Sequence, residues 1–240
     1  MKIALVTGAN KGIGLETAKK LAELGHYVYL GCRNLDLGQI AVDQLHKNGF
    51  KNTEIIQIDL TKSKTIKKAK ETIESKSGLL DILVNNAGIL GAIPQPATST
   101  NVEEIYKIFD TNFFGTIEVT QEFLPLLQKS EAGRIVNVTS DLSSLTLHND
   151  PTWKYYPFKS VGYSISKTAL NGYTIMLAFG LKESNIKVNA VNPGHTATDF
   201  NNHRGDKKPK ETAGVIVKYA TIGNDGPNGK FLNSEGEMPW

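Results

Sequence analysis

The chain has few of the features that assign a protein to a specialised class. It contains one cysteine, Cys32, so no disulfide can form within it, and such usage is typical of a reducing compartment. No apolar run approaches the ~20 residues that a membrane-spanning helix needs. A formal net charge of +3 is too small to indicate binding to nucleic acid or to an anionic membrane surface. His148, His195 and His203 lack metal-ligand spacing, so we expect no metal.

Length and composition predict one soluble domain. The chain has 240 residues, of which 40% are hydrophobic and 21% are charged, and these values are ordinary for a globular protein with one continuous core. Met1 is followed almost at once by the apolar run Ile3–Val6, which leaves no room for a signal peptide. We therefore expect a cytoplasmic protein in which residues 1–240 form a single domain.

A glycine-rich stretch, Thr7–Gly14, stands between an expected strand and an expected helix. The run Ile3–Val6 is typical of a strand buried on both faces, and residues 15–24 space their apolar side chains at helical intervals. At such a turn, the free N–H groups and the helix dipole can hold a phosphate, and glycines let a pyrophosphate approach. No Gly-Lys-Ser/Thr follows, so the stretch is not a P-loop, although ordinary strand-to-helix turns can also be rich in glycine.

The rest of the chain alternates expected strands and helices. Strands are expected at 27–31, 55–58, 82–84, 134–139 and 187–191, and helices at 37–48, 63–75, 102–127 and 163–181. This alternation predicts an α/β fold with a doubly wound parallel sheet and helices on both faces. Residues 195–210 lack periodicity and are expected to form a loop or lid, and 229–240 is a candidate for a final edge strand. Ligands of such folds bind beyond the carboxyl ends of the strands.

Residues after the second strand bear on the choice of cofactor. Folds that prefer NAD usually carry a carboxylate here for the ribose 2′-hydroxyl, whereas this chain has Cys32 followed by Arg33. Arginine offers a bidentate fork to a 2′-phosphate, and Lys11 is a plausible second cation, so the pattern favours NADP(H). The alternative is that Arg33 is a solvated residue and Asp36 binds the ribose, although Asp36 better suits a helix start.

Further polar residues follow the other strands. Asn85-Asn86-Ala87-Gly88 lets the backbone run close beneath a cofactor, or forms a plain tight turn. Ser140 follows the fifth strand, and Tyr163 and Lys167 open the next helix with an i, i+4 spacing that places both on one face. Tyr-x-x-x-Lys alone is common by chance. Taken together and in this order, the motifs resemble the short-chain dehydrogenase/reductase family across nearly the whole chain: Gly8-x-x-x-Gly12-x-Gly14, Asn85–Gly88, Asn112, Ser140, Tyr163, Lys167 and Pro193-Gly194.

The resemblance implies a single Rossmann-type domain and a role for each residue of the expected catalytic set. Tyr163 would be the acid/base, Ser140 would position and polarise the carbonyl, and Asn112 would hold a water and proton path. Lys167 would bind the nicotinamide ribose, and a charge about 4 Å from the phenol can also lower the tyrosine pKa by ~3 units. The full set of expected cofactor contacts is Gly8, Asn10, Lys11, Gly12, Ile13, Gly14, Arg33, Asp59, Leu60, Asn85, Ala87, Gly88, Tyr163, Lys167, Pro193, Gly194, Thr196 and Thr198. Asp59 would contact adenine, although it could also simply start a helix.

The segment between Ser140 and Tyr163 is longer than in most members of that family. Residues 141–162 carry a cluster of apolar and aromatic side chains: Leu145, Leu147, His148, Trp153, Tyr155, Tyr156 and Phe158. We expect part of this loop to form an apolar wall of the substrate pocket, with residues 195–210 on the opposite side. Such a pocket suits ketones with an aryl or bulky alkyl group. The alternative is that the cluster packs on the body of the protein or at a subunit interface.

The expected function is that of a cytoplasmic, NADPH-dependent carbonyl reductase, an oxidoreductase that converts a ketone or aldehyde reversibly to an alcohol. Two alternatives are a catalytically inactive NADP(H)-binding sensor or scaffold, and a sugar-nucleotide epimerase or dehydratase. A complete Asn112, Ser140, Tyr163 and Lys167 set disfavours the first, and the glycine spacing and the chain length disfavour the second. We expect a small-molecule substrate as partner, neither nucleic acid nor membrane, and a monomer, dimer or tetramer. The physiological substrate and the stereochemical outcome stay open.

Overall fold

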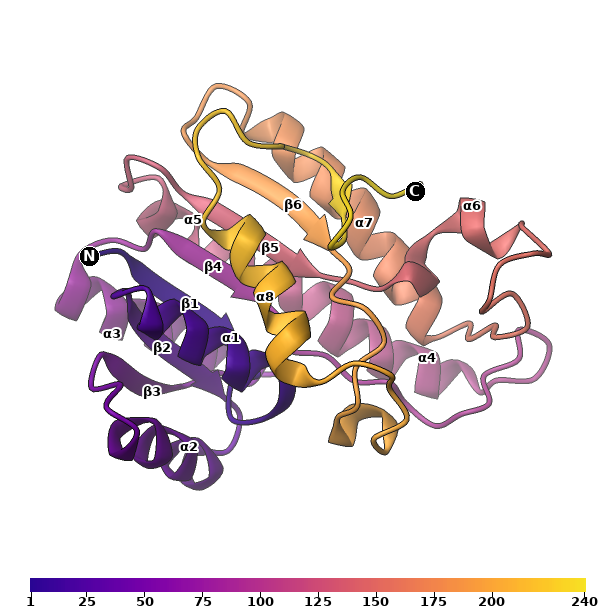
Figure 1. Ribbon diagram of the computed structural model, residues 1–240, viewed down its shortest axis with the longest axis horizontal. Coiled ribbons are helices and arrows are strands. Elements are labelled where there is room, and N and C mark those ends of the chain that lie inside the picture. Colours follow the sequence, from indigo (N-terminus) through magenta and orange to yellow (C-terminus); the bar gives the residue numbers. More distant parts are fainter.

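The computed structural model describes residues 1–240 and contains a seven-stranded parallel sheet between two layers of helices (Figure 1). The strands are β1 (Ile3–Thr7), β2 (Tyr27–Cys32), β3 (Thr53–Gln57), β4 (Ile82–Asn85), β5 (Arg134–Val138), β6 (Lys187–Val191) and β7 (Phe231–Leu232). The helices are α1 (Gly12–Glu23), α2 (Leu35–Lys47), α3 (Ser63–Ser77), α4 (Val102–Phe109), α5 (Gly115–Leu127), α6 (Leu145–His148), α7 (Tyr163–Gly180) and α8 (Pro209–Ala220). Three shorter helical elements are η1 (Asp110–Phe114), η2 (Asp141–Ser143) and η3 (Asp199–Asn201).

The strand order is β3-β2-β1-β4-β5-β6-β7, and every pairing is parallel. Strand β1 lies at the centre, where Leu5 is opposite Tyr29 of β2 on one side and Leu83 of β4 on the other. The chain therefore winds outward from β1 in one direction and then, through β4, in the other. The predicted doubly wound parallel sheet is confirmed, and its switch point lies between β1 and β4.

Each central strand sends alternate side chains to two separate hydrophobic cores. Ala4 and Val6 of β1 face the core under α1, α2 and α8, while Leu5 faces the core under α3, α5 and α7. In Figure 1, α1 and α8 lie side by side in front of the sheet, and the α5 and α7 layer lies behind it. Burial on both faces explains why the strand sequences are continuously apolar rather than alternating.

Three elements differ from the sequence prediction or refine it. The single helix expected over 102–127 is divided into α4 and α5 by the π-helical turn η1, which contains Asn112. Helix α8 begins at Pro209, at the end of the segment expected to be loop, and the expected final edge strand is β7. None of the helices is both long enough and apolar enough to cross a membrane.

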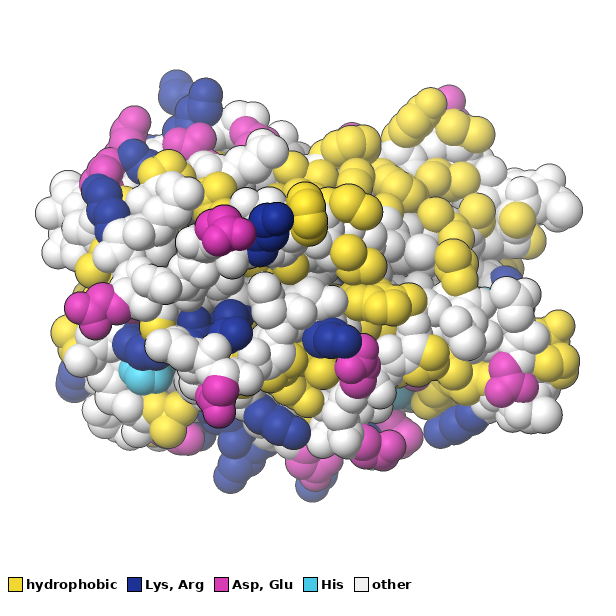
Figure 2. Space-filling model, turned by 90° about the horizontal axis from the view of Figure 1, so that it is seen from above, with side chains coloured by type: hydrophobic (Ala, Val, Ile, Leu, Met, Phe, Trp, Pro, Cys, Tyr) yellow, Lys and Arg dark blue, Asp and Glu magenta, His cyan; other side chains and the backbone are white.

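One face of the molecule carries a patch of apolar side chains. Figure 2 shows these side chains gathered over part of the surface, with basic and acidic side chains interspersed elsewhere. The exposed apolar residues of η1 and α7, which contact each other, are Phe114, Ile165, Ile175, Met176 and Phe179. Exposed patches of this kind mark surfaces that other molecules cover.

Candidate active site

The glycine-rich turn between β1 and α1 has a backbone that requires glycine. Gly8 and Gly12 have positive φ angles of 65° and 58°, and a Cβ on Gly14 would collide with the carbonyl oxygen of Gly8. Asn86, which follows β4, braces the turn by donating from Nδ2 to the carbonyl oxygens of Thr7 (2.9 Å) and Gly8 (3.3 Å). The open N-terminus of α1 is thereby held at the carboxyl edge of the sheet, where it can bind an anion.

A cleft of about 1190 Å³ extends along this edge from Arg33, past the glycine turn, to Tyr163. Its volume exceeds the ~300–1,000 Å³ of a site for one small ligand, so it has room for a cofactor and a substrate together. Most of the expected cofactor contacts line it: Gly8, Asn10, Lys11, Gly12, Ile13, Gly14, Arg33, Asp59, Leu60, Ala87, Gly88, Tyr163, Lys167, Pro193, Gly194, Thr196 and Thr198.

Asn85 is the exception among the expected cofactor contacts. Its side chain is buried in the sheet, where Nδ2 donates to Thr120 Oγ1 and to Asn137 Oδ1, both at 2.9 Å. It does not line the cleft, whereas the next residue, Asn86, does. The reason is the alternation of side chains at a strand end: adjacent residues point to opposite sides.

Asn112 is also fully buried and does not line the cleft. Its Oδ1 accepts from the N–H of Ile89 (2.8 Å), and its Nδ2 donates to the Ile89 carbonyl (2.9 Å) and to Ser166 Oγ (3.0 Å). These bonds tie the segment after β4 to helix α7. The π-helical turn η1 around Asn112 places a polar side chain between these two elements, and π-helical turns are frequent at functional sites.

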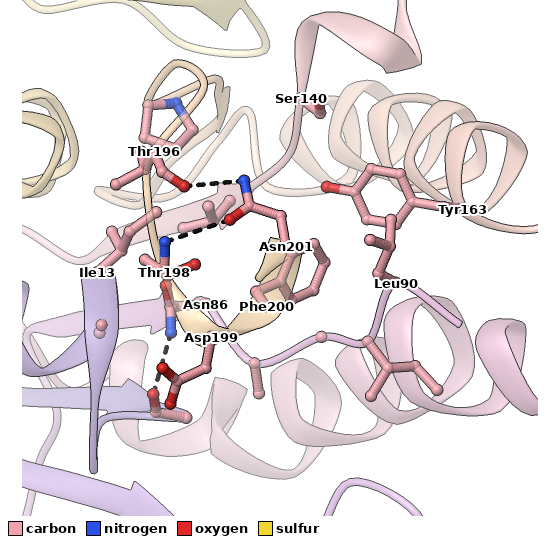
Figure 3. Close-up of a pocket in the computed structure, with 18 of the residues that line it drawn as sticks. Ile13, Asn86, Leu90, Ser140, Tyr163, Thr196, Thr198, Asp199, Phe200 and Asn201 are labelled. Atoms are coloured by element: carbon pink, nitrogen blue, oxygen red, sulfur yellow. Dashed lines mark hydrogen bonds between the residues drawn. The ribbon is translucent and has the colours of Figure 1, made fainter. Parts of the chain in front are cut away.

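Ser140 lies close to the hydroxyl end of Tyr163 (Figure 3). Tyr163 is the first residue of α7, and its N–H donates to Gln95 Oε1 at 2.9 Å, which fixes the start of the helix. Ser140 caps η2 directly after β5. Lys167 lies one turn along α7, buried, and its Nζ donates to the carbonyl oxygen of Val138 at 2.8 Å. The structure thus brings together three of the four residues that the sequence picked out for catalysis.

Burial is the main cause of the pKa shifts of Tyr163 and Lys167. It raises the pKa of Tyr163, the nearby Ser140 hydroxyl acts in the opposite direction, and the charge of Asp141 raises that pKa further. Burial also lowers the pKa of Lys167 to about 8. The expectation that Lys167 lowers the pKa of Tyr163 is therefore not met in this structure, because the lysine is itself desolvated and its ammonium is directed at the Val138 carbonyl.

Residues 195–204 fold over the cleft as an ordered lid. Asn201 donates from Nδ2 to the Thr196 carbonyl (3.0 Å) and accepts at Oδ1 from the Thr198 N–H (3.2 Å), which closes the loop on itself (Figure 3). Phe200 then lies with its ring centroid 5.6 Å from that of Tyr163. Lys11 of the glycine turn forms an ion pair with Asp199 at 2.8 Å, so the lid is tethered across the cleft.

The expected apolar wall is divided between two cavities. Tyr155 and Phe158 line the main cleft, together with Leu90, Ile93, Leu142 and Phe200. Trp153 and Leu147 instead line a smaller cavity of about 200 Å³. Leu145 is exposed. The Tyr163 end of the main cleft is therefore apolar, and Tyr155 and Phe158 are the members of the expected cluster that line it.

Comparison with known proteins agrees with this geometry. A family model described as short chain dehydrogenase matches residues 2–209. The chain belongs to the short-chain dehydrogenase family. It is 37% identical over 228 residues to the short-chain dehydrogenase anuI of Penicillium roqueforti, covering 92% of this chain and 89% of that protein.

Two solved structures are similar over their full lengths. The structure of salutaridine reductase from Papaver somniferum has a TM-score of 0.85 and 30% identity, covering 98% of this chain and 100% of that one. The structure of NADPH-bound carbonyl reductase from chicken fatty liver has a TM-score of 0.87 and 26% identity, covering 100% of both chains.

In this short-chain dehydrogenase, Arg33 is exposed at the end of the cleft far from Tyr163 and has no ion pair within the chain. Asp36, the alternative ribose ligand, does not line the cleft and lies in the first turn of α2, after the cap Asn34. Asp59 lines the cleft and also forms a turn. Burial alone would raise the pKa of Asp59, but hydrogen bonds from Thr61 and the charge of Lys62 lower it. Arg33 is thus an unpaired cation at this end of the cleft.

Several residues of the site gave little or no signal in the sequence. Asn86 lies within the Asn-Asn-Ala-Gly motif, but the motif alone does not say which asparagine faces the turn. Gln95 positions Tyr163 across 68 residues of sequence, and Asp141 lines the cleft directly beside Ser140. Phe200 covers Tyr163 from a polar loop. Only the fold brings these residues to the site. The chain has no group of three His, Cys, Asp or Glu side chains arranged to hold a metal ion.

Proposed function

We propose that this short-chain dehydrogenase is a cytoplasmic, NADPH-dependent carbonyl reductase that converts a ketone or aldehyde to an alcohol. The observation that carries the proposal is the convergence of Ser140, Tyr163 and Lys167 at the apolar end of the cleft that begins at the glycine turn. A protein that only bound the cofactor would not need a phenol, a hydroxyl and a buried ammonium around one space.

The residues present fit a nicotinamide dinucleotide. The glycine turn leaves open the space that a Cβ would fill, at the positive end of α1, where a pyrophosphate is favoured. Gly88 lies close enough to Lys167 that a Cβ there would be 3.6 Å from Nζ, so the backbone approaches the cleft closely near the catalytic end. When bound, the reduced cofactor would supply the hydride to the carbonyl carbon.

Tyr163 would donate the proton to the carbonyl oxygen. Ser140, whose hydroxyl donates to Asp141 Oδ1 in this structure, would turn that hydrogen to the same carbonyl oxygen when a substrate is bound. A pKa raised by burial keeps the phenol protonated at neutral pH, which suits reduction rather than oxidation. Lys167, whose ammonium is held at the Val138 carbonyl, would bind the ribose hydroxyls. Asn112 would act indirectly, by holding the segment after β4 against α7.

The preference for NADPH over NADH rests on the charges at the far end of the cleft. Arg33 is unpaired and can hold a 2′-phosphate with two parallel N–H groups. Lys11, the expected second cation, is paired with Asp199 of the lid at 2.8 Å, so it would share its charge between the phosphate and the lid. Arg33 therefore carries most of the proposed selectivity.

The test is the consumption of NADPH, followed by absorbance, with a panel of ketones and aldehydes that includes aryl ketones. Tyr163→Phe keeps the ring and removes the proton, so turnover is expected to fall by about a hundredfold or more while NADPH binding persists. Tyr106→Phe is the matched control, because Tyr106 is exposed on α4. Tight NADPH binding without reduction of any carbonyl would favour the sensor. A Tyr163→Phe protein with undiminished turnover would remove Tyr163 from the mechanism.

A further inference from the structure

Asp141 is a carboxylate without a cation beside the proposed catalytic serine. Its Oδ1 accepts from Ser140 Oγ at 3.1 Å and from the N–H of Leu142 at 3.0 Å. Its Oδ2 has no hydrogen bond within the chain, and no lysine or arginine lies within ion-pair distance. Burial raises the pKa of Asp141, while the hydrogen bonds from Ser140 and Leu142 and the charge of His195 act in the opposite direction. A cationic ligand group would supply the missing partner.

The side chain of Asp141 lines both the main cleft and the smaller cavity of about 200 Å³. The two cavities share a wall that also includes Tyr155, Pro193 and His195. A substrate in the main cleft would therefore lie within reach of Asp141, which also borders the smaller cavity. The carbonyl end of such a substrate would stay at Ser140 and Tyr163.

The smaller cavity offers aromatic faces as well as negative charge. Trp153 and Tyr155 line it with their rings in an edge-to-face arrangement, with centroids 5.6 Å apart. Lys154 already lies 4.9 Å from the centroid of the Tyr155 ring, so this ring attracts a cation in the structure itself. Quaternary and protonated amines are bound in this way, by aromatic rings together with a carboxylate.

The smaller cavity carries further charges. Asp206 and Glu235 add negative charge, although Asp206 is within 3.6 Å of Lys154. Lys207 is the one lysine of the lining, and no carboxylate lies within ion-pair distance of it. Three carboxylates thus line the cavity with one lysine and with His195, which faces Asp141 and Asp206. Asp141 is the carboxylate next to the reacting groups.

We propose that the substrate is a ketone or aldehyde that also carries a protonated amine, and that Asp141 and Tyr155 hold this amine; the proposal rests on the proposed carbonyl reductase activity. The distance between the Ser140 and Asp141 side chains limits how far apart the carbonyl and the amine can be. A carbonyl oxygen bonded to Ser140 and an amine bonded to Oδ2 of Asp141 can be separated by no more than about 11 Å, given hydrogen bonds of ordinary length. The amine therefore lies several bonds from the carbonyl, on the same small molecule.

The experiment compares two ketones of the same shape, 4-(aminomethyl)acetophenone and 4-ethylacetophenone, of which only the first is cationic. We expect the unmodified enzyme to favour the amine about ten- to hundredfold in kcat/KM, because a hydrogen bond between ions discriminates by that amount. Asp141→Asn keeps the acceptor for the Leu142 N–H and removes the charge, so the ratio of kcat/KM for the two ketones should fall to about one, whatever the absolute rates become. Asp36→Asn is the control, since it changes the net charge equally at a residue outside the cleft.

The outcomes separate this proposal from the proposed activity. If Asp141→Asn lowers kcat/KM for both ketones equally, Asp141 only positions Ser140 and the amine site is refuted. An unmodified enzyme without preference for the amine refutes it as well. If neither ketone is reduced, the reductase activity is in question, and calorimetric binding of the two compounds decides the amine site: tighter binding of the amine that is lost in Asp141→Asn supports it, and equal binding refutes it. Tyr155→Leu should reduce the preference partly, through loss of the ring.

Discussion

The burial of Lys167 predicts how the stability of the cofactor-free protein depends on pH. Its ammonium is buried, it has one hydrogen bond, to the Val138 carbonyl, and burial lowers its pKa to about 8 from the ordinary 10.5. A shift of this size corresponds to about 3 kcal/mol of destabilisation while the group is charged in the folded state. Lys167→Met keeps an unbranched side chain of similar length and removes the charge.

The direction of the pH dependence of stability follows from how many protons the folded and unfolded states bind. Between about pH 8 and 10.5, the unfolded chain keeps the proton of Lys167 while the folded protein has lost it, so stability rises with pH. Below pH 8 the full penalty applies. Lys167→Met removes the penalty and loses a hydrogen bond worth about 1 kcal/mol, so we expect it to be about 2 kcal/mol more stable at pH 7. This advantage should shrink by about 1 kcal/mol at pH 9 and by about 2–3 kcal/mol at pH 10.

Urea unfolding of both proteins at pH 7, 8, 9 and 10, without cofactor, measures the effect. The quantity to compare is the difference in unfolding free energy between the Lys167→Met protein and the unmodified protein at each pH. Burial raises the pKa of Cys32 to about 12 and also raises that of Tyr163, and both shifts reduce stability at high pH in either protein. Lys47→Met, on the exposed face of α2, is the control and should show a constant difference. A Lys167→Met difference that varies by less than about 0.5 kcal/mol from pH 7 to 10 would refute the reasoning.

Three further predictions concern the cleft. Arg33→Ala should reduce the preference for NADPH over NADH about ten- to hundredfold with NADH kinetics nearly unchanged, and equal kcat/KM for both cofactors in the unmodified enzyme would contradict the assignment. Asn112→Ala leaves the N–H and carbonyl of Ile89 without partners, so thermal and urea unfolding should show a loss of about 2–4 kcal/mol; a loss of turnover at full stability would instead show a direct catalytic role. Phe158→Ala should lower kcat/KM for aryl ketones about tenfold and leave acetone unaffected, whereas an equal loss for both would mean that Phe158 supports the loop rather than the substrate.

Local patterns in the sequence were sufficient to predict most of the fold. Continuous apolar runs such as Ile3–Val6 are typical of strands that helices cover on both faces. Because such runs alternate with segments of helical periodicity, few topologies other than a doubly wound parallel sheet are possible. The glycine turn is equally local, because Gly8 and Gly12 need positive φ angles that other residues avoid. The one-turn spacing of Tyr163 and Lys167 placed both on one face of a helix before any tertiary contact was known.

Tertiary structure decided the features that depend on distant contacts. Sequence spacing could not show that Asn86 rather than Asn85 faces the glycine turn, since this depends on where β4 ends. Nor could it show that Lys11 pairs with Asp199, 188 residues away. The titration of Tyr163 and Lys167 is also a tertiary property: spacing placed a cation near a phenol, but desolvation by the surrounding elements outweighs that charge. Side-chain periodicity is local, whereas burial and the pairing of charges depend on the whole fold.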